Sequence, residues 1–222
     1  MAITFPAGLD VFFSKLPIQS AEPDLQDSYE AEETGRGEII TTEMGERLWQ
    51  MTVNLRPMEY DEAEEIQALI RMFRRAGATF LAYPIPRMYP RFDPNGSAIL
   101  SSGLQPVLHT VGANMRDIRI GGLPPGYRLA GGDFISWAYG SNPTRNALHQ
   151  VVGATVSAAS NGITPNLEVN PPVRLGYETP QNVAITRPRM KALILPGSAS
   201  PAKMAGMWAT GASFTIRQTL GR

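Results

Sequence analysis

The most regular hydrophobic pattern in the chain is a short alternation of large apolar and polar residues. The apolar positions are Trp49, Met51, Val53 and Leu55. In an extended chain, successive side chains point to opposite faces, so this pattern predicts a β-strand with one buried and one exposed face. Pro57 lacks a backbone N–H and is expected to end the strand.

A helical pattern follows this strand directly. Its apolar residues recur every three or four positions, at Ala63, Ile66, Ile70 and Phe73. That spacing predicts an amphipathic helix over residues 61–76. Asp61 is the expected N-cap, with Glu64 completing a capping box, and Gly77 is expected to end the helix in the left-handed conformation.

The rest of the chain predicts short strands separated by turn residues. Alternation at Leu9, Val11 and Phe13 predicts a first strand that ends at Pro17. Further strands are expected at 79–83, 117–120, 133–139, 148–156, 166–169, 183–186, 190–195 and 213–220. Asn161-Gly162 is the strongest hairpin signal, because both residues tolerate the positive φ of a type I′ turn. Short strands with this punctuation are typical of a sandwich or barrel.

Two Pro/Gly/Ser-rich stretches, 93–103 and 196–201, predict boundaries between compact units. The last strand has to pair, and we expect it to return to the sheet that contains Trp49. The predicted domains are therefore 1–97 with 198–222, and an insert at 98–197. The expected fold is mainly β: an N-terminal β-barrel or sandwich with one amphipathic helix, plus an inserted all-β barrel or sandwich.

Composition excludes several classes of function. The 20 basic and 20 acidic residues balance, so no overall field attracts nucleic acid or an anionic membrane. With no cysteine, disulfides, thiolate metal sites and cysteine nucleophiles are excluded. We find no signal-peptide pattern and no apolar run of about 18 residues, and so expect no membrane span and synthesis in a cytosol-like compartment.

Charge is segregated along the first ninety residues. An acidic stretch at 22–33 precedes a stretch, up to Arg91, whose basic residues are all arginine. This pattern suits a head-to-tail contact between subunits, which closes into a ring. The residues expected at that interface are Glu30, Glu32, Glu33, Arg71, Arg74 and Arg75. The alternative is a solvated acidic arm, with the three arginines stabilised by the C-terminal end of the helix dipole.

Candidate chemistry is sparse, and we predict no catalytic, cofactor-binding or metal-binding residue. His109 and His149 stand far apart without metal-ligand spacing. Asp133 follows two glycines and is expected in a turn that leads into a strand. Three aromatic residues could face a sugar ligand, although strand spacing also suits a core role; they are Tyr127, Trp137 and Tyr139. A pair of carboxylates for glycoside hydrolysis is the remaining enzyme alternative.

Two segments of the chain resemble the distal tail proteins of long-tailed bacteriophages, prophages and gene-transfer particles. The first comprises residues 48–55, Pro57, the acidic helix and the run 79–84. The second is more informative and is similar to the Gly-Asp-aromatic-Ile … Val … Gly … Pro-Pro-Leu-Arg pattern of the family's inserted domain. Its residues are 129–136, 148–152, Asn161-Gly162 and 167–174.

This resemblance implies a structural virion protein of the phage tail, made in the host cytoplasm and without enzyme activity. It implies a homohexameric ring at the distal end of the tail tube, which binds the tube protein, the tail hub and tip or fibre proteins. DNA would pass through the lumen without specific binding. The alternatives are another tail-tip, tail-terminator or neck ring protein, or a carbohydrate-binding module of the host-recognition apparatus.

Overall fold

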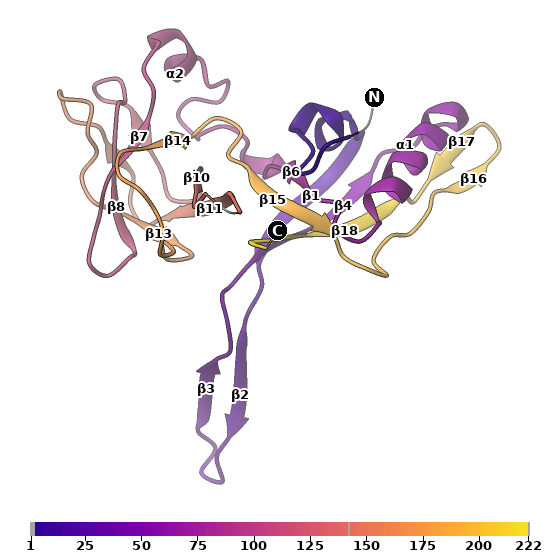
Figure 1. Cartoon of the computed structure of the whole chain (residues 1–222), viewed down its shortest axis with the longest axis horizontal. Helices are drawn as coiled ribbons and strands as arrows, with labels where there is room; N and C mark the ends of the chain where they lie inside the picture. The colour runs from indigo at the N-terminus through magenta and orange to yellow at the C-terminus, as the bar shows by residue number, and fades with distance from the viewer. Residues whose placement is uncertain (1–2, 142, 222) are drawn as a thin grey trace.

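The computed structural model describes residues 3–141 and 143–221, and the chain in it is mainly β, with 39% strand and 13% helix. Residues 1, 2, 142 and 222, which the expected domain ranges include, lie outside that description. Figure 1 shows a sheet domain that carries a long helix, a barrel beside it, and a two-stranded arm that projects away from both. The expected mainly β fold is confirmed.

The first domain is built on an open antiparallel sheet with the strand order β1-β4-β18-β15-β6, and not on the predicted barrel or sandwich, because a helix covers its buried face. These strands are β1 Ile18–Leu25, β4 Trp49–Leu55, β6 Phe80–Ala82, β15 Met190–Ile194 and β18 Ser213–Gln218. In β4, Val53 pairs with Ala21 of β1 on one side and with Phe214 of β18 on the other. The expected return of the last strand to this sheet is therefore confirmed.

The predicted insert, 98–197, is too long at its C-terminal end. Strand β15 pairs with β18 and β6 of the first sheet and does not belong to the barrel. Its residues Met190, Ala192 and Ile194 are buried in the core of the first domain. A short apolar strand carries no local information about which sheet it joins, and this is why the pattern placed it wrongly.

Helix α1, Tyr60–Phe73, covers the buried face of this sheet. Its buried residues are Ala63, Ile66, Ile70 and Phe73, as the spacing predicts. The helix begins one residue earlier and ends three residues earlier than expected, with Glu59 as N-cap and without a side-chain capping bond. The predicted capping box is absent from the described residues; Glu64 instead accepts a 2.9 Å hydrogen bond from the Tyr60 hydroxyl.

The predicted first strand is wrong. The segment forms two short 3-10 turns, η1 Leu9–Val11 and η2 Phe13–Lys15. Consecutive residues Phe12 and Phe13 are both fully buried, which a strand with one wet face cannot achieve. The ring of Phe12 stacks on Phe73 at 4.1 Å between centroids and meets Phe80 at 4.7 Å. The N-terminus thus closes the aromatic core beneath α1.

The insert contains a closed barrel with the strand order β10-β11-β13-β8-β7-β14. Its strands are β7 Val107–Val111, β8 Asp117–Gly121, β10 Phe134–Tyr139, β11 Arg145–Val152, β13 Leu167–Asn170 and β14 Gln181–Ala184. Two short strands, β9 Arg128–Leu129 and β12 Val156–Ser157, pair beside it. The entry segment carries η3 Ile85–Arg87. A second helix, α2 Ser97–Ser102, lies within the stretch 93–103 that was predicted to be a linker.

The turn at Asn161-Gly162 differs from the predicted type I′. Only Gly162 has positive φ (73°). Its N–H donates to the Ala159 carbonyl, and the Ala159 N–H donates to the Ile163 carbonyl, both at 2.9 Å. A Cβ at position 162 would lie 2.5 Å from the Leu123 carbonyl oxygen. Close approach to that backbone, as well as the turn, therefore requires glycine here.

Two small sheets complete the fold. A three-stranded sheet with the order β16-β17-β5 lies next to α1 and consists of β5 Met58–Glu59, β16 Lys203–Ala205 and β17 Trp208–Thr210. The projecting arm is the hairpin of β2 Tyr29–Glu33 and β3 Ile39–Glu43, which continues β1 and leads back into β4.

Candidate functional site

The arm is a hairpin whose strands contain no buried residue. Every residue of β2 and β3 is exposed, including Tyr29 at 52%, Ile39 at 71% and Ile40 at 58% of their surface. A two-stranded hairpin with no second layer is marginally stable in water. Large apolar side chains on such a hairpin indicate a segment that is covered when it meets another surface.

The arm carries its carboxylates on both faces. In the hairpin register, Glu30 lies opposite Thr42, and Glu32 lies opposite Ile40, on one face. Glu33 lies on the other face, because successive side chains of a strand alternate. The three glutamates predicted at an interface therefore belong to one element but do not share one face.

The predicted arginines lie on a different part of the molecule. Arg71 is in the last turn of α1, Arg74 is its C-cap, and Arg75 follows. Figure 1 shows the arm projecting from the region between the two domains, with α1 at the far end of the sheet domain. Among the described residues, no ion pair joins the two sets, so an acidic-arm-to-arginine contact is available only between chains.

Two of these arginines already have local contacts. Arg71 donates a 3.3 Å hydrogen bond to the side chain of Gln67, one helical turn earlier. The guanidinium of Arg75 lies 5.0 Å from the centre of the Phe5 ring. Both contacts are at the surface and of the kind that a charged partner can replace.

An apolar patch that the sequence pattern did not reveal lies on the β16–β17 hairpin. Met204, Met207 and Trp208 are 44%, 79% and 53% exposed, and Tyr60 of α1 is 46% exposed. Trp208 pairs with Glu59, which places the patch beside the acidic first half of α1. Like charges would therefore disfavour docking of the acidic arm at this patch. The one local indication of this hairpin in the sequence is Gly206, which adopts φ 64° in the turn.

The three aromatic residues proposed to face a ligand are core residues instead. Tyr127, Trp137 and Tyr139 are 7%, 3% and 5% exposed and belong to the barrel's hydrophobic cluster. The Tyr127 hydroxyl donates to the Asp93 carboxylate at 3.2 Å, and burial together with that carboxylate raises the pKa of Tyr127. Packing of both faces of β10 removes the rings of Trp137 and Tyr139 from the surface.

A shallow surface depression of about 650 Å³ lies between α2, β10 and β14. Amide side chains line much of it, among them Gln105, Asn146 and Gln181. Trp137 contributes to its floor but is too buried to stack on a sugar ring. The depression therefore has polar groups without the exposed aromatic ring that the sequence hypothesis required.

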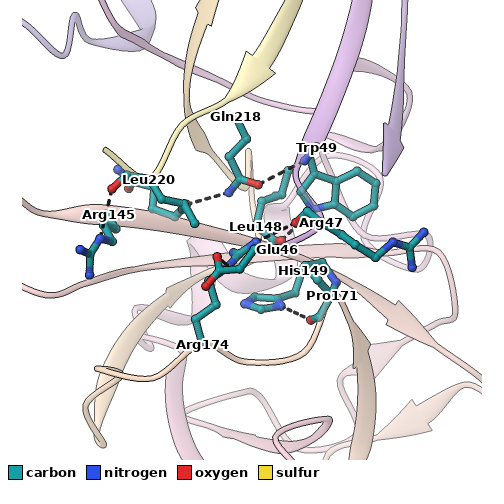
Figure 2. A network of polar contacts seen from close by, with 11 residues as sticks. Glu46, Arg47, Trp49, Arg145, Leu148, His149, Pro171, Arg174, Gln218 and Leu220 are labelled. Carbon is teal, nitrogen blue, oxygen red and sulfur yellow. Dashed lines mark hydrogen bonds and ion pairs between the residues drawn. The ribbon is translucent and has the colours of Figure 1, made fainter. Parts of the chain in front are cut away.

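A polar network joins the barrel to the first sheet, as Figure 2 shows. The Trp49 indole N–H donates to the Leu148 carbonyl at 2.8 Å, and its ring meets Phe134 edge-on at 5.2 Å. The Gln218 side-chain oxygen accepts from the backbone N–H of Trp49 at 3.3 Å, and the Gln218 amide group donates to the Asn146 carbonyl at 3.0 Å. One strand, β4, therefore serves both the core of the sheet domain and the domain junction.

Arg174 adds the root of the arm to this network. Its side chain is 8% exposed, its Nε lies 2.6 Å from the Glu46 Oε2 atom, and its Nη2 donates to the Arg47 carbonyl at 2.9 Å. Arg47 in turn pairs with Asp27 across the arm root at 3.0 Å. These contacts link both legs of the arm to the barrel.

The two histidines differ in environment. His109 is exposed on β7, whereas His149 is fully buried, stacked on Trp137 at 4.4 Å between ring centres. A carbonyl oxygen only accepts, so the 2.6 Å contact from His149 Nδ1 to the Pro171 carbonyl requires a proton on Nδ1. Burial is the main cause that lowers the pKa of His149 to about 3, and the Arg174 charge adds to it. His149 is therefore a neutral structural residue.

Asp133 stands where the Gly-Gly-Asp pattern predicts, in the turn before β10. Its buried carboxylate accepts hydrogen bonds from the N–H of Arg91 at 2.9 Å and of Ala130 at 2.8 Å. It thereby holds the entry segment of the insert against the turn.

Residues 3–141 and 143–221 contain no group of three His, Cys, Asp or Glu side chains that could hold a metal ion. Comparison with known proteins found no matching family model and no matching curated protein. In the same part of the chain, no helix combines the length and the apolar character needed to cross a membrane.

Proposed function

We propose that this chain is a structural protein of a long-tailed phage-like particle, and that it forms a ring at the distal end of the tail tube. The ring joins the tube to the hub and to tip or fibre proteins. The observation that carries the proposal is the arm: a hairpin with all ten strand positions exposed, with apolar and acidic side chains, on a protein whose other domains are well packed.

The order of domains supports the same function. The chain resembles distal tail proteins in the strand that contains Trp49, in the helix and in the Gly-Asp pattern around Asp133, and these segments lie in a sheet domain with an inserted barrel. In such a protein the sheet domain would build the ring, and the insert would project from the ring and position other proteins. The site of action is the tail of the virion.

Within the ring, the acidic arm of one subunit meets the arginines at the end of α1 of its neighbour. Such a heterologous contact repeats around a closed ring. The arm glutamates and Arg71, Arg74 and Arg75 lie on different parts of one chain, as a head-to-tail contact requires. The pairing is at the surface and is therefore expected to weaken as salt is raised.

The function is tested with the purified chain mixed with the tube and hub proteins of the same particle. Electron microscopy and native mass spectrometry are expected to show a ring that binds both. A chain that stays monomeric with both partners present, or that binds only a capsid-side partner, would overturn the proposal.

The contact is tested by charge reversal. Changing Glu30, Glu32 and Glu33 together to lysine, or the three arginines to glutamate, is expected to weaken the ring, and combining the two sets to restore it. Arg116→Glu, an exposed arginine on the barrel, is the matched control. Rings that form equally in every variant would exclude this pairing while leaving the ring itself intact.

A further inference from the structure

The direction of the arm is determined only at its root. Its ten strand residues are all exposed, and its legs are joined at the base by hydrogen bonds from Met44 N–H to the Ser28 carbonyl and from Gln26 N–H to the Leu48 carbonyl. The side chains of Asp27 and Arg47 add a 3.0 Å ion pair across the same base. These contacts hold the legs together but leave open where the arm points.

The contact from the arm root to the barrel is made by Arg174. This residue follows Pro171 and Pro172, after β13, and reaches out of the barrel to Glu46 and to the Arg47 carbonyl, at 2.6 and 2.9 Å. Figure 2 shows it extending from the barrel side toward the arm root. A guanidinium with two partners in fixed directions defines an orientation, which a single point charge does not.

Several other contacts between the barrel and the sheet domain do not involve the arm. They join Trp49 to Leu148, Gln218 to Asn146, and Arg145 to the Leu220 carbonyl at 3.1 Å. These bonds connect the sheet domain to the barrel. The junction therefore has two separable parts: one fixes the barrel on the sheet, and the other fixes the arm on the barrel.

We infer that the Glu46–Arg174 pair is a latch that couples the direction of the arm to the barrel. When the arm is seated on a partner, its root and the barrel move as one body, and when the latch is broken the arm swings independently. The coupling is a property of a single chain. It goes beyond the proposed ring and does not depend on it, so failure of either leaves the other standing.

Because the chain has no cysteine, two cysteines can be introduced at chosen positions and each can be spin-labelled. One pair, at the exposed positions Arg36 of the arm tip and Thr110 of the barrel, measures the arm against the barrel. A second pair, at Glu65 of α1 and Thr110, measures the sheet domain against the barrel. Electron–electron double resonance gives the distribution of each distance.

In Glu46→Gln and in Arg174→Gln, the Arg36–Thr110 distribution is expected to broaden while the Glu65–Thr110 distribution stays unchanged. Arg56→Gln, which breaks the exposed 3.0 Å pair with Glu62, is the matched control and is expected to change neither. An Arg36–Thr110 distribution that stays narrow in both latch variants overturns the inference. Broadening of both distances together also overturns it, because Arg174 would then only hold the domains in place.

Discussion

Acid is expected to destabilise the inserted barrel through His149. The pKa of this buried imidazole is lowered from 6.5 to about 3, chiefly by burial, although its hydrogen bond to the Pro171 carbonyl opposes the change. In the unfolded chain the same ring takes up a proton at its ordinary pKa. The unfolded state therefore binds more protons in the window between 6.5 and about 3, and the free energy of unfolding falls as the pH is lowered through it.

The size of the effect follows from the two pKa values. One pKa unit corresponds to about 1.4 kcal/mol, so the interval from 6.5 to about 3 amounts to about 5 kcal/mol. About 3 kcal/mol of this is lost by about pH 4.5. This stability is fully present above the unfolded pKa. The cause is that a proton on Nε2, which is buried and has no partner among the described atoms, would create a buried charge and an unpaired donor.

The assay is urea unfolding at a series of values between about pH 8 and about pH 4.5, which yields the free energy of unfolding at each. His149→Asn is expected to be less stable at neutral pH but to lose less stability on acidification than the unchanged protein. His109→Asn, at the chain's other histidine, is the matched control and keeps the full dependence. Carboxylates common to all three proteins cancel in the comparison. A His149→Asn protein that loses stability as steeply as the unchanged one would refute the reasoning.

Two further substitutions test the core and the entry to the insert. Trp49→Ala is expected to cost about 3–5 kcal/mol, whereas Trp49→Phe keeps a ring against Phe134 but leaves the Leu148 carbonyl without its donor, at a cost of about 1–3 kcal/mol. Denaturant unfolding measures both losses, and a Trp49→Phe protein as stable as the unchanged one would contradict the bridging role. Asp133→Asn replaces one of two accepting oxygens with a donor facing a backbone N–H and is expected to cost about 1–3 kcal/mol. Amide exchange at Arg91 and Ala130 is expected to rise in that variant, and unchanged protection would contradict this role.

The hydrophobic pattern of the chain was enough to locate the elements whose burial is periodic. The alternation from Trp49 to Leu55 and the spacing from Ala63 to Phe73 each report one face against a core, and the structure buries those residues. The Gly-Gly-Asp turn and the absence of cysteine chemistry were equally readable, because they depend on local backbone preference and on composition.

Which surfaces meet became known only from the folded chain. Strand β15 joins the first sheet. The segment with Phe12 and Phe13 forms 3-10 turns, which bury both rings in the core. The rings of Tyr127, Trp137 and Tyr139 are covered by the barrel. None of these outcomes is encoded in a local period, because each depends on segments far away in the chain. The same holds for the bond from Trp49 to Leu148 and the pair of Glu46 with Arg174, whose partners are separated by 99 and 128 residues. Local sequence specifies a buried face, whereas only the assembled fold specifies what that face is buried against.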